Sequence, residues 1–140
     1  MTDLALPPDL AATADALLAR VRAATRILIP THINVDGDSL ASVLALSRAL
    51  RGLGRETVAV VSDGQVPHHL RGMLRDDAPL RYDGTPLPPT DLSFLADITG
   101  LGRLGAMGDA LADRLTPATT LNVDHHVSNE RFGAVNLVDP

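Results

Sequence analysis

An apolar segment that leads directly into a loop of one histidine and two aspartates constrains this chain more than any other stretch. Ile27 to Ile29 show no polar alternation, which is typical of a central strand covered on both faces. Residues 39–53 then have the apolar spacing of a helix. The loop between them contains His32, Asp36, Gly37 and Asp38. The two carboxylates therefore lie at a strand-to-helix junction, where open α/β sheets place their ligand sites.

Apolar runs alternate with helical patterns along the rest of the chain. An amphipathic N-terminal helix is expected over residues 9–24, capped by the Pro7-Pro8-Asp9 sequence, before a core over residues 26–140. We expect further strands at Thr57–Val61, Leu80–Tyr82, Leu92–Ala96, Thr119–Val123 and Ala134–Val138, a short helix or turn from Val66 to Met73, and a helix at Arg103–Leu115. The alternation predicts an α/β fold, a doubly wound parallel sheet of about five strands with helices on both faces.

Acidic and imidazole side chains follow three of the expected strands. Asp97 follows the strand at 92–96, and the strand at 119–123 leads into Asp124, His125 and His126. Because the carboxyl ends of parallel strands open on one edge, these groups should converge with the first loop in one crevice. Crowded carboxylates repel one another, so a bound cation is the simplest way to tolerate them.

The donor types indicate which cation would bind. Oxygen and nitrogen ligands without sulfur favour Mn²⁺, followed by Mg²⁺, Co²⁺ or Fe²⁺, with Zn²⁺ also compatible. The ligands suffice for two ions roughly 3.5–4 Å apart, the arrangement that hydrolyses phosphate esters.

Composition excludes several functional classes. The chain has no cysteine, which removes disulfides, thiolate metal sites and cysteine nucleophiles. Its net charge of −5 and aromatic content of 2% disfavour long duplex nucleic acid and base-stacking surfaces as partners. Met1 to Pro8 lacks the features of a secretory signal and no apolar run reaches membrane-spanning length, so a cytoplasmic location without membrane contact is expected. A homodimer is compatible with the sequence.

Three motifs in order resemble those of the DHH phosphoesterase family. They are His32-x-x-x-Asp36-Gly-Asp38, the lone Asp97 after an apolar strand, and Asp124-His125-His126-x-Ser128-Asn129. The branch of oligoribonucleases and 3′-phosphoadenosine-5′-phosphate (pAp) phosphatases is the most similar, since it also matches Val60-x-x-Asp63-x-x-Val66-Pro67, Arg103-Leu-Gly105 and Phe132-Gly133-x-x-Asn136-Leu-Val-Asp139-Pro140.

The resemblance implies a two-metal phosphoesterase that acts on small nucleotides or short oligonucleotides with a metal-activated water. It implies that His32 and Asp36 bind one ion, that Asp38 and His125 bind the other, and that Asp97 bridges both. Asp124 would support the site and His126 would face the substrate phosphate. Ser128, Asn129 and Arg103 are further candidates for substrate binding.

The chain departs from the family pattern at Val35, where the family has proline, and at Ala41, where it has glycine. By the same resemblance, a fourth aspartate motif and a DHHA1-type substrate-binding domain would follow Pro140. We therefore expect these residues to be the N-terminal part of a DHH domain, which alone is incomplete as an enzyme.

Structural interpretations stand beside the functional ones. Asp36 or Asp38 could cap the helix that follows, and Asp97 could cap a turn. Arg103 and Arg131 are as compatible with solvated surface charges as with a phosphate clamp. Ser128 and Asn129 could shape the turn after the histidines. His68 and His69 lack nearby carboxylates in the sequence and are expected to be inert.

Two other functions remain as alternatives. The chain could be a metal- or nucleotide-binding module without catalysis. Asp36-Gly-Asp38-Ser39 also imitates the signature of haloacid dehalogenase phosphatases, in which Asp36 would be a covalent nucleophile. That signature should follow its strand directly, however, and the chain contains no lysine for that family's catalytic position.

Overall fold

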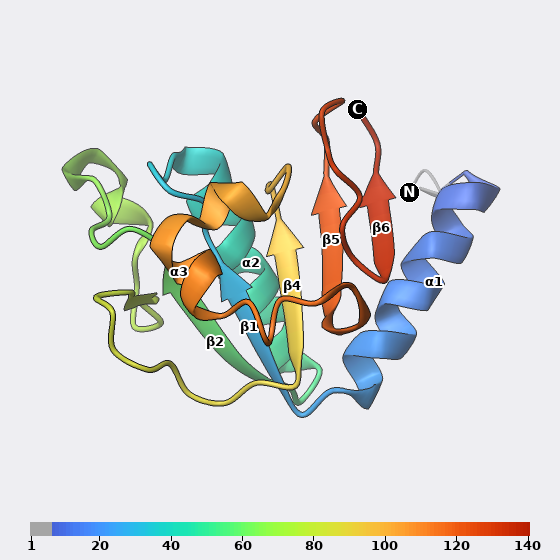
Figure 1. The fold of residues 1–140 in the computed structure, drawn as a ribbon, viewed down its shortest axis with the longest axis horizontal. Helices are drawn as coiled ribbons and strands as arrows, with labels where there is room; N and C mark the ends of the chain where they lie inside the picture. The colour runs from blue at the N-terminus through green and yellow to red at the C-terminus, as the bar shows by residue number, and fades with distance from the viewer. Residues whose placement is uncertain (1–6) are drawn as a thin grey trace.

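The computed structural model describes residues 7–140, whose strands form one parallel sheet in the order β3-β2-β1-β4-β5-β6 (Figure 1). The strands are β1 (Arg26–Pro30), β2 (Glu56–Val61), β3 (Leu80–Arg81), β4 (Leu92–Ala96), β5 (Thr120–Asp124) and β6 (Val135–Val138). The chain builds outward from β1 on one side and from β4 on the other. The topological switch point, where doubly wound sheets bind ligands, therefore lies between β1 and β4.

Helices cover both faces of this sheet, which confirms the predicted doubly wound α/β fold. They are α1 (Pro8–Ala23), α2 (Gly37–Gly52) and α3 (Gly105–Ala110), with 3₁₀ segments η1 (His68–Met73), η2 (Leu101–Leu104) and η3 (Pro117–Thr119). Ile27 and Ile29 of β1 pack in the cluster that contains residues of α1 and α2. Leu28, between them, packs on the other face with residues of η2 and α3. All three side chains are fully buried, as their aliphatic run predicts.

Two details of the predicted helices were wrong. Residues 103–115 do not form one helix, because η2 ends at Leu104 and α3 covers only Gly105–Ala110. Gly105 has a φ of +56° and a Cβ there would lie 2.8 Å from Ile33 Cγ2, so the backbone kinks at a close approach that only glycine permits. At α1 the N-cap residue is Pro7 and no side chain caps it, while Asp9 lies in the first turn.

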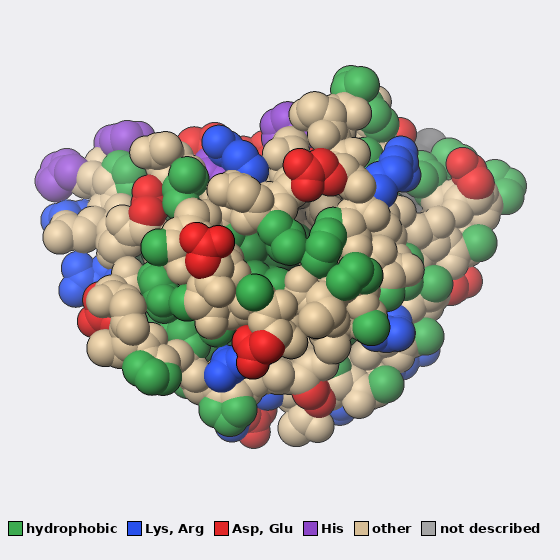
Figure 2. Space-filling view, viewed as in Figure 1, with side chains coloured by type: hydrophobic (Ala, Val, Ile, Leu, Met, Phe, Trp, Pro, Cys, Tyr) green, Lys and Arg blue, Asp and Glu red, His purple; other side chains and the backbone are tan. Residues whose placement is uncertain are grey.

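The connection between β5 and β6 matters for the site. Residues 125–134 join these parallel strands without a helix, and backbone bonds tie the segment down where Glu130 N donates to Thr99 O and Ala134 N to Thr120 O. The segment therefore holds the residues after β5 against the end of β4. Figure 2 shows histidine, acidic and basic side chains along the rim above the strand ends.

Among residues 7–140, no helix is both long and apolar enough to span a bilayer. The expectation that Met1 to Pro8 is not a secretory signal falls mainly on residues 1–6, which lie outside the described part of the chain.

Candidate metal centre

The carboxyl ends of β1, β4 and β5 surround a cavity of about 390 Å³ at the switch point. Its lining consists of His32, Asp36, Asp38, Asp97, Thr99, Arg103, His125 and His126. The three motifs, which lie far apart in the sequence, thus share one site. His68 and His69 are exposed on η1, outside this cavity.

His32 follows β1 and is almost completely buried at 5% exposure. Its Nδ1 lies 2.7 Å from the Ile33 carbonyl oxygen, so Nδ1–H donates there and Nε2 faces the cavity. Nε2 lies 3.6 Å from Asp36 Oδ2 and 3.7 Å from Asp97 Oδ2. These separations exceed hydrogen-bond length, but two donors that each bind one ion at about 2.1 Å lie roughly 3–4 Å apart.

Asp36 combines two functions that the sequence leaves as alternatives. Its Oδ1 accepts a hydrogen bond of 2.9 Å from Ser39 N and so caps α2. Its other oxygen faces His32. Capping therefore fixes the carboxylate without using the oxygen that a metal would need. This arrangement also disfavours the dehalogenase alternative, because Asp36 is a helix cap separated from the end of β1 at Pro30.

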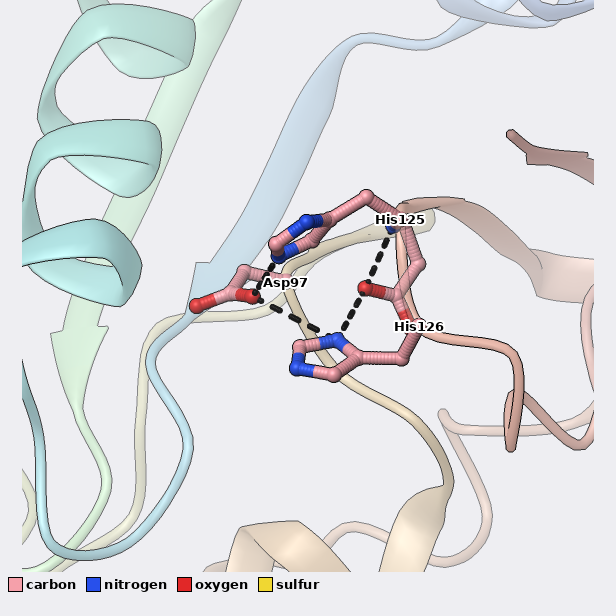
Figure 3. A group of neighbouring side chains, drawn as sticks. Asp97, His125 and His126 are labelled. Carbon is pink, nitrogen blue, oxygen red and sulfur yellow. Dashed lines mark hydrogen bonds and ion pairs between the residues drawn. The ribbon is translucent and has the colours of Figure 1, made fainter. Parts of the chain in front are cut away.

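Asp97 faces both histidines that follow β5 (Figure 3). It has a φ of +60°, a strained conformation for a residue other than glycine that is typical of functional sites. Its Oδ2 faces His32, while Oδ1 lies 3.3 Å from His125 Nε2 and 3.6 Å from His126 Nδ1. Burial, followed by the charges of Asp38 and Asp36, raises the pKa of Asp97. One carboxylate thus reaches both halves of the cavity.

The outer half of the cavity consists of Asp38, His125 and the Oδ1 side of Asp97. Asp38 lies in the first turn of α2, and its Oδ2 is 3.5 Å from His125 Nε2. Both side chains are more than half exposed. The predicted second group of ligands is therefore together, but at the rim of the cavity.

Asp124 supports the histidines from behind, and its side chain is fully buried. Oδ1 accepts bonds from His125 N at 2.8 Å and His126 Nδ1 at 2.7 Å, and Oδ2 accepts one from Asn129 Nδ2 at 2.7 Å. Burial alone would raise the pKa of Asp124, but the hydrogen bonds from Asn129 and His126 lower it overall. Its oxygens lie near those of Asp97 and the histidines, but both already accept hydrogen bonds, and Asp124 does not line the cavity.

The candidate substrate-binding residues differ in their exposure and in how many of their polar atoms are already hydrogen-bonded within the protein. The hydrogen bond to Asp124 raises the pKa of His126, whose ring is 44% exposed at the cavity wall. Arg103 lines the cavity, and Ser128 and Arg131 are exposed. The Asn129 amide donates to Asp124 and the Ile98 carbonyl and accepts from Asn122 and Arg131 N. All of its bonds are thus internal, which fits the turn-shaping alternative.

Two residues at the site are absent from the sequence-based candidates. Thr99 lines the cavity from the turn after β4. Ser39 Oγ accepts a hydrogen bond of 3.3 Å from His32 N and joins the start of α2 to the first loop. The only signal in the sequence is that each lies one or two residues beyond a predicted ligand, Asp97 or Asp38.

The side chains present fit divalent metal ions. Imidazole nitrogens and carboxylate oxygens face one another at 3.3–3.7 Å, and no thiolate exists in the chain. The carbonyl bond to His32 Nδ1 resembles the outer interactions that orient histidine ligands in metal sites. The donor set suits Mn²⁺, Mg²⁺, Fe²⁺, Co²⁺ or Zn²⁺ and does not select one of them.

Comparisons with known proteins agree with the motifs. No protein-family model matches the chain. The chain is 32% identical over 116 residues to the bifunctional oligoribonuclease and PAP phosphatase NrnA of Thermus thermophilus, a match that covers 81% of this chain and 32% of that protein. An exopolyphosphatase-related protein from Bacteroides fragilis shares the fold, with a TM-score of 0.79 and 23% identity over 100% of this chain and 41% of that one. The chain thus spans about a third of its curated relative, and the predicted resemblance is confirmed.

Proposed function

We propose that this chain, similar in sequence to the oligoribonuclease and pAp phosphatase branch of the DHH phosphoesterases, carries the metal centre of such an enzyme. The whole protein would hydrolyse phosphodiester or phosphomonoester bonds of small nucleotides, short oligoribonucleotides or pAp-like substrates. The observation that carries the proposal is that three side chains from the ends of three strands line one cavity. They are His32, Asp97 and His125.

His32, Asp36 and the Oδ2 side of Asp97 would hold the inner ion. Asp38, His125 and the Oδ1 side of Asp97 would hold the outer ion, with Mn²⁺ the preferred metal at both positions. Two such ions, when bound, activate a water molecule at neutral pH and neutralise phosphate charge. This chain's contribution is to fix the donors around them, which capping and the Ile33 carbonyl accomplish for the inner half.

The residues around the ions would bind the phosphate. Asp124 orients His126 through Nδ1, so the Nε2–H of the imidazolium is left to donate to a phosphate oxygen. Arg103 would supply a second cationic group from the cavity wall. Without bound cations, the carboxylates of the cavity would repel a phosphate, so nucleotide binding should require the metal. Ser128, which is exposed two residues after His126, would contact the substrate beyond the phosphate.

The partners follow from the size and charge of the site. A small nucleotide or short oligonucleotide can be held by the ions, whereas the net charge of −5 disfavours long duplex nucleic acid. The cytoplasmic location and the homodimer stay predictions.

Metal titration and hydrolysis test the proposal separately. Calorimetry with Mn²⁺ should show two ions per chain, and His125→Ala should reduce that number. Release of phosphate from pAp, or of mononucleotides from a dinucleotide, should then require Mn²⁺ in the full-length protein. A folded chain that binds no divalent ion would refute the metal centre. Ion and nucleotide binding without turnover in the full-length protein would favour the non-catalytic alternative.

A further inference from the structure

The loop that carries His32 is held by four successive backbone N–H groups, each bonded to a different part of the fold. Thr31 N donates to Val60 O at 2.8 Å and Ile33 N to Arg103 O at 2.8 Å. His32 N donates to Ser39 Oγ at 3.3 Å. The fourth group, Asn34 N, donates to Asp63 Oδ2 at 2.6 Å. Strand β2, helix α2, segment η2 and the turn after β2 thus all fix this loop.

The bond from Asn34 is special because of the backbone conformation at that residue. Asn34 has a φ of +56°, in the left-handed region that asparagine enters more readily than other residues with a side chain but less readily than the ordinary φ range, so a hydrogen bond at its N–H helps to select it. A short hydrogen bond to a charged carboxylate is stronger than one between neutral groups. Asp63 is the only carboxylate that accepts from the N–H groups of residues 31–34, so it is the group best suited to stabilise the turn.

The position of Asn34 explains why this turn matters. It lies midway between His32 and Asp36, whose donor atoms face each other at 3.6 Å. The chain bends at Ile33 and Asn34, and the side chains of His32 and Asp36 face each other across this bend. If Asn34 relaxed toward the ordinary φ range, Asp36 would move relative to His32.

We propose that Asp63 is a positioning residue for the metal centre, acting through the Asn34 amide to hold His32 and Asp36 in register. The expected effect on metal binding rests on the proposed function, whereas the geometry of the loop is independent of that function. Asp63 is not among the residues that line the cavity, and its hydrogen bond is to the Asn34 backbone rather than to a predicted ligand. Loss of Asp63 would therefore weaken binding of the inner ion without removing any of its ligands.

Three variants of the chain isolate this effect. Asp63→Ala removes the acceptor, whereas Asp63→Asn removes the charge and keeps an oxygen that can accept from Asn34 N. Asp83→Ala is the matched control, because it removes an equal charge from a carboxylate that accepts from Thr85 N in a loop outside the cavity. Circular dichroism and thermal melting establish that all variants fold.

Calorimetry with Mn²⁺ gives the first readout. Asp63→Ala should weaken the tighter binding step about 10- to 100-fold, the range usual for outer partners of metal ligands. Asp63→Asn should lose clearly less, about threefold, since a weaker neutral hydrogen bond remains. Equal affinity in Asp63→Ala and the parent chain would overturn the inference. So would an equal loss in Asp63→Ala and Asp63→Asn, because the acceptor that Asp63→Asn keeps would then make no difference.

Nuclear magnetic resonance of the metal-free chain gives a second readout that does not depend on the proposed function. In Asp63→Ala the Asn34 amide should exchange faster and the backbone amide signals of His32 and Asp36 should shift. Unchanged exchange and unchanged amide signals would overturn the positioning role. If the parent chain binds no Mn²⁺ while these signals respond as expected, the proposed function fails and the positioning of the loop by Asp63 stands.

Discussion

The inner and outer halves of the cavity differ in how firmly the fold holds their histidines. The His32 side chain is 6% exposed and Nδ1 is bonded to a carbonyl, so the direction of its free nitrogen is fixed. The His125 side chain is 61% exposed. Its Nε2 lies 3.3 Å from Asp97 and 3.5 Å from Asp38, and its ring centroid lies 4.5 Å from that of His126. Asp97 is the one residue that faces both histidines.

The inner half of the cavity is organised before a ligand binds, whereas the outer half is not. Hydrogen bonds already orient the His32 ring and the Oδ1 oxygen of Asp36. An ion that binds there therefore has little further ordering to impose on these side chains. At the outer half, binding must immobilise two exposed side chains, which costs conformational entropy. The structure therefore predicts unequal ion affinities, with the inner position tighter and the outer position dependent on Asp97 and Asp124.

Asp97→Asn should have the largest effect, because it removes the group shared by both halves. We expect Mn²⁺ affinity to fall more than about 100-fold at both positions, beyond the range of outer-partner changes, and hydrolysis by the full-length protein to reach background. Asparagine tolerates the left-handed φ of this position.

Thermal melting of the metal-free chain distinguishes this loss from misfolding. Because burial and neighbouring carboxylates raise the pKa of Asp97, its charged form opposes folding above its pKa. Removing the charge should therefore leave the melting temperature at neutral pH equal or higher. A variant that keeps one tight ion would show that the halves do not share Asp97.

His32→Ala and His125→Ala test the inequality directly. Each should remove one of the two ions in a Mn²⁺ titration, but the ion that remains in His125→Ala should bind roughly three- to tenfold more tightly than the one left in His32→Ala. The reason is that His125→Ala leaves the preorganised half intact. His68→Ala, which removes an exposed histidine outside the cavity, is the control. The reverse order of affinities would contradict the comparison.

Asp124→Asn should affect the outer half alone. The asparagine side chain has one acceptor oxygen, so it cannot replace all the bonds that Asp124 accepts from the histidine segment and Asn129. We expect about a tenfold loss at the weaker Mn²⁺ step and little change at the tighter one. Asp91→Asn is the control, because Asp91 also accepts more than one hydrogen bond, in its case from Thr25 N and Arg26 N, and lies outside the cavity. Equal losses at both steps would refute this division.

The same contrast separates what the sequence could predict from what it could not. The aliphatic run of β1 and the position of each acid at a strand end are local patterns, and they sufficed for the fold and for the meeting of three motifs. The kink at Gly105 follows from a contact with Ile33, seventy-two residues away in the sequence, so the helical pattern over 103–115 was misleading. Likewise, the internal bonds of Asn129 depend on Asn122 and Ile98, which no local pattern pairs with it.

Asp77 provides the smallest expected effect and tests whether a carboxylate outside the cavity matters. It accepts hydrogen bonds from Arg48 and Arg51 of α2, and the bond from Arg48 is the main cause that lowers its pKa to about 2. A carboxyl group with a lowered pKa in the folded state stabilises the protein above its unfolded pKa of 3.8, and this contribution disappears as pH falls toward 2. Asp77→Asn should therefore be slightly less stable than the parent chain at pH 6, with a difference that narrows below about pH 4.

Urea unfolding at several pH values measures this difference, and Mn²⁺ affinity should not change. A stability difference that widens on acidification would contradict the ion pair, whereas weaker Mn²⁺ binding would mean that the metal centre depends on charge far from both halves of the cavity.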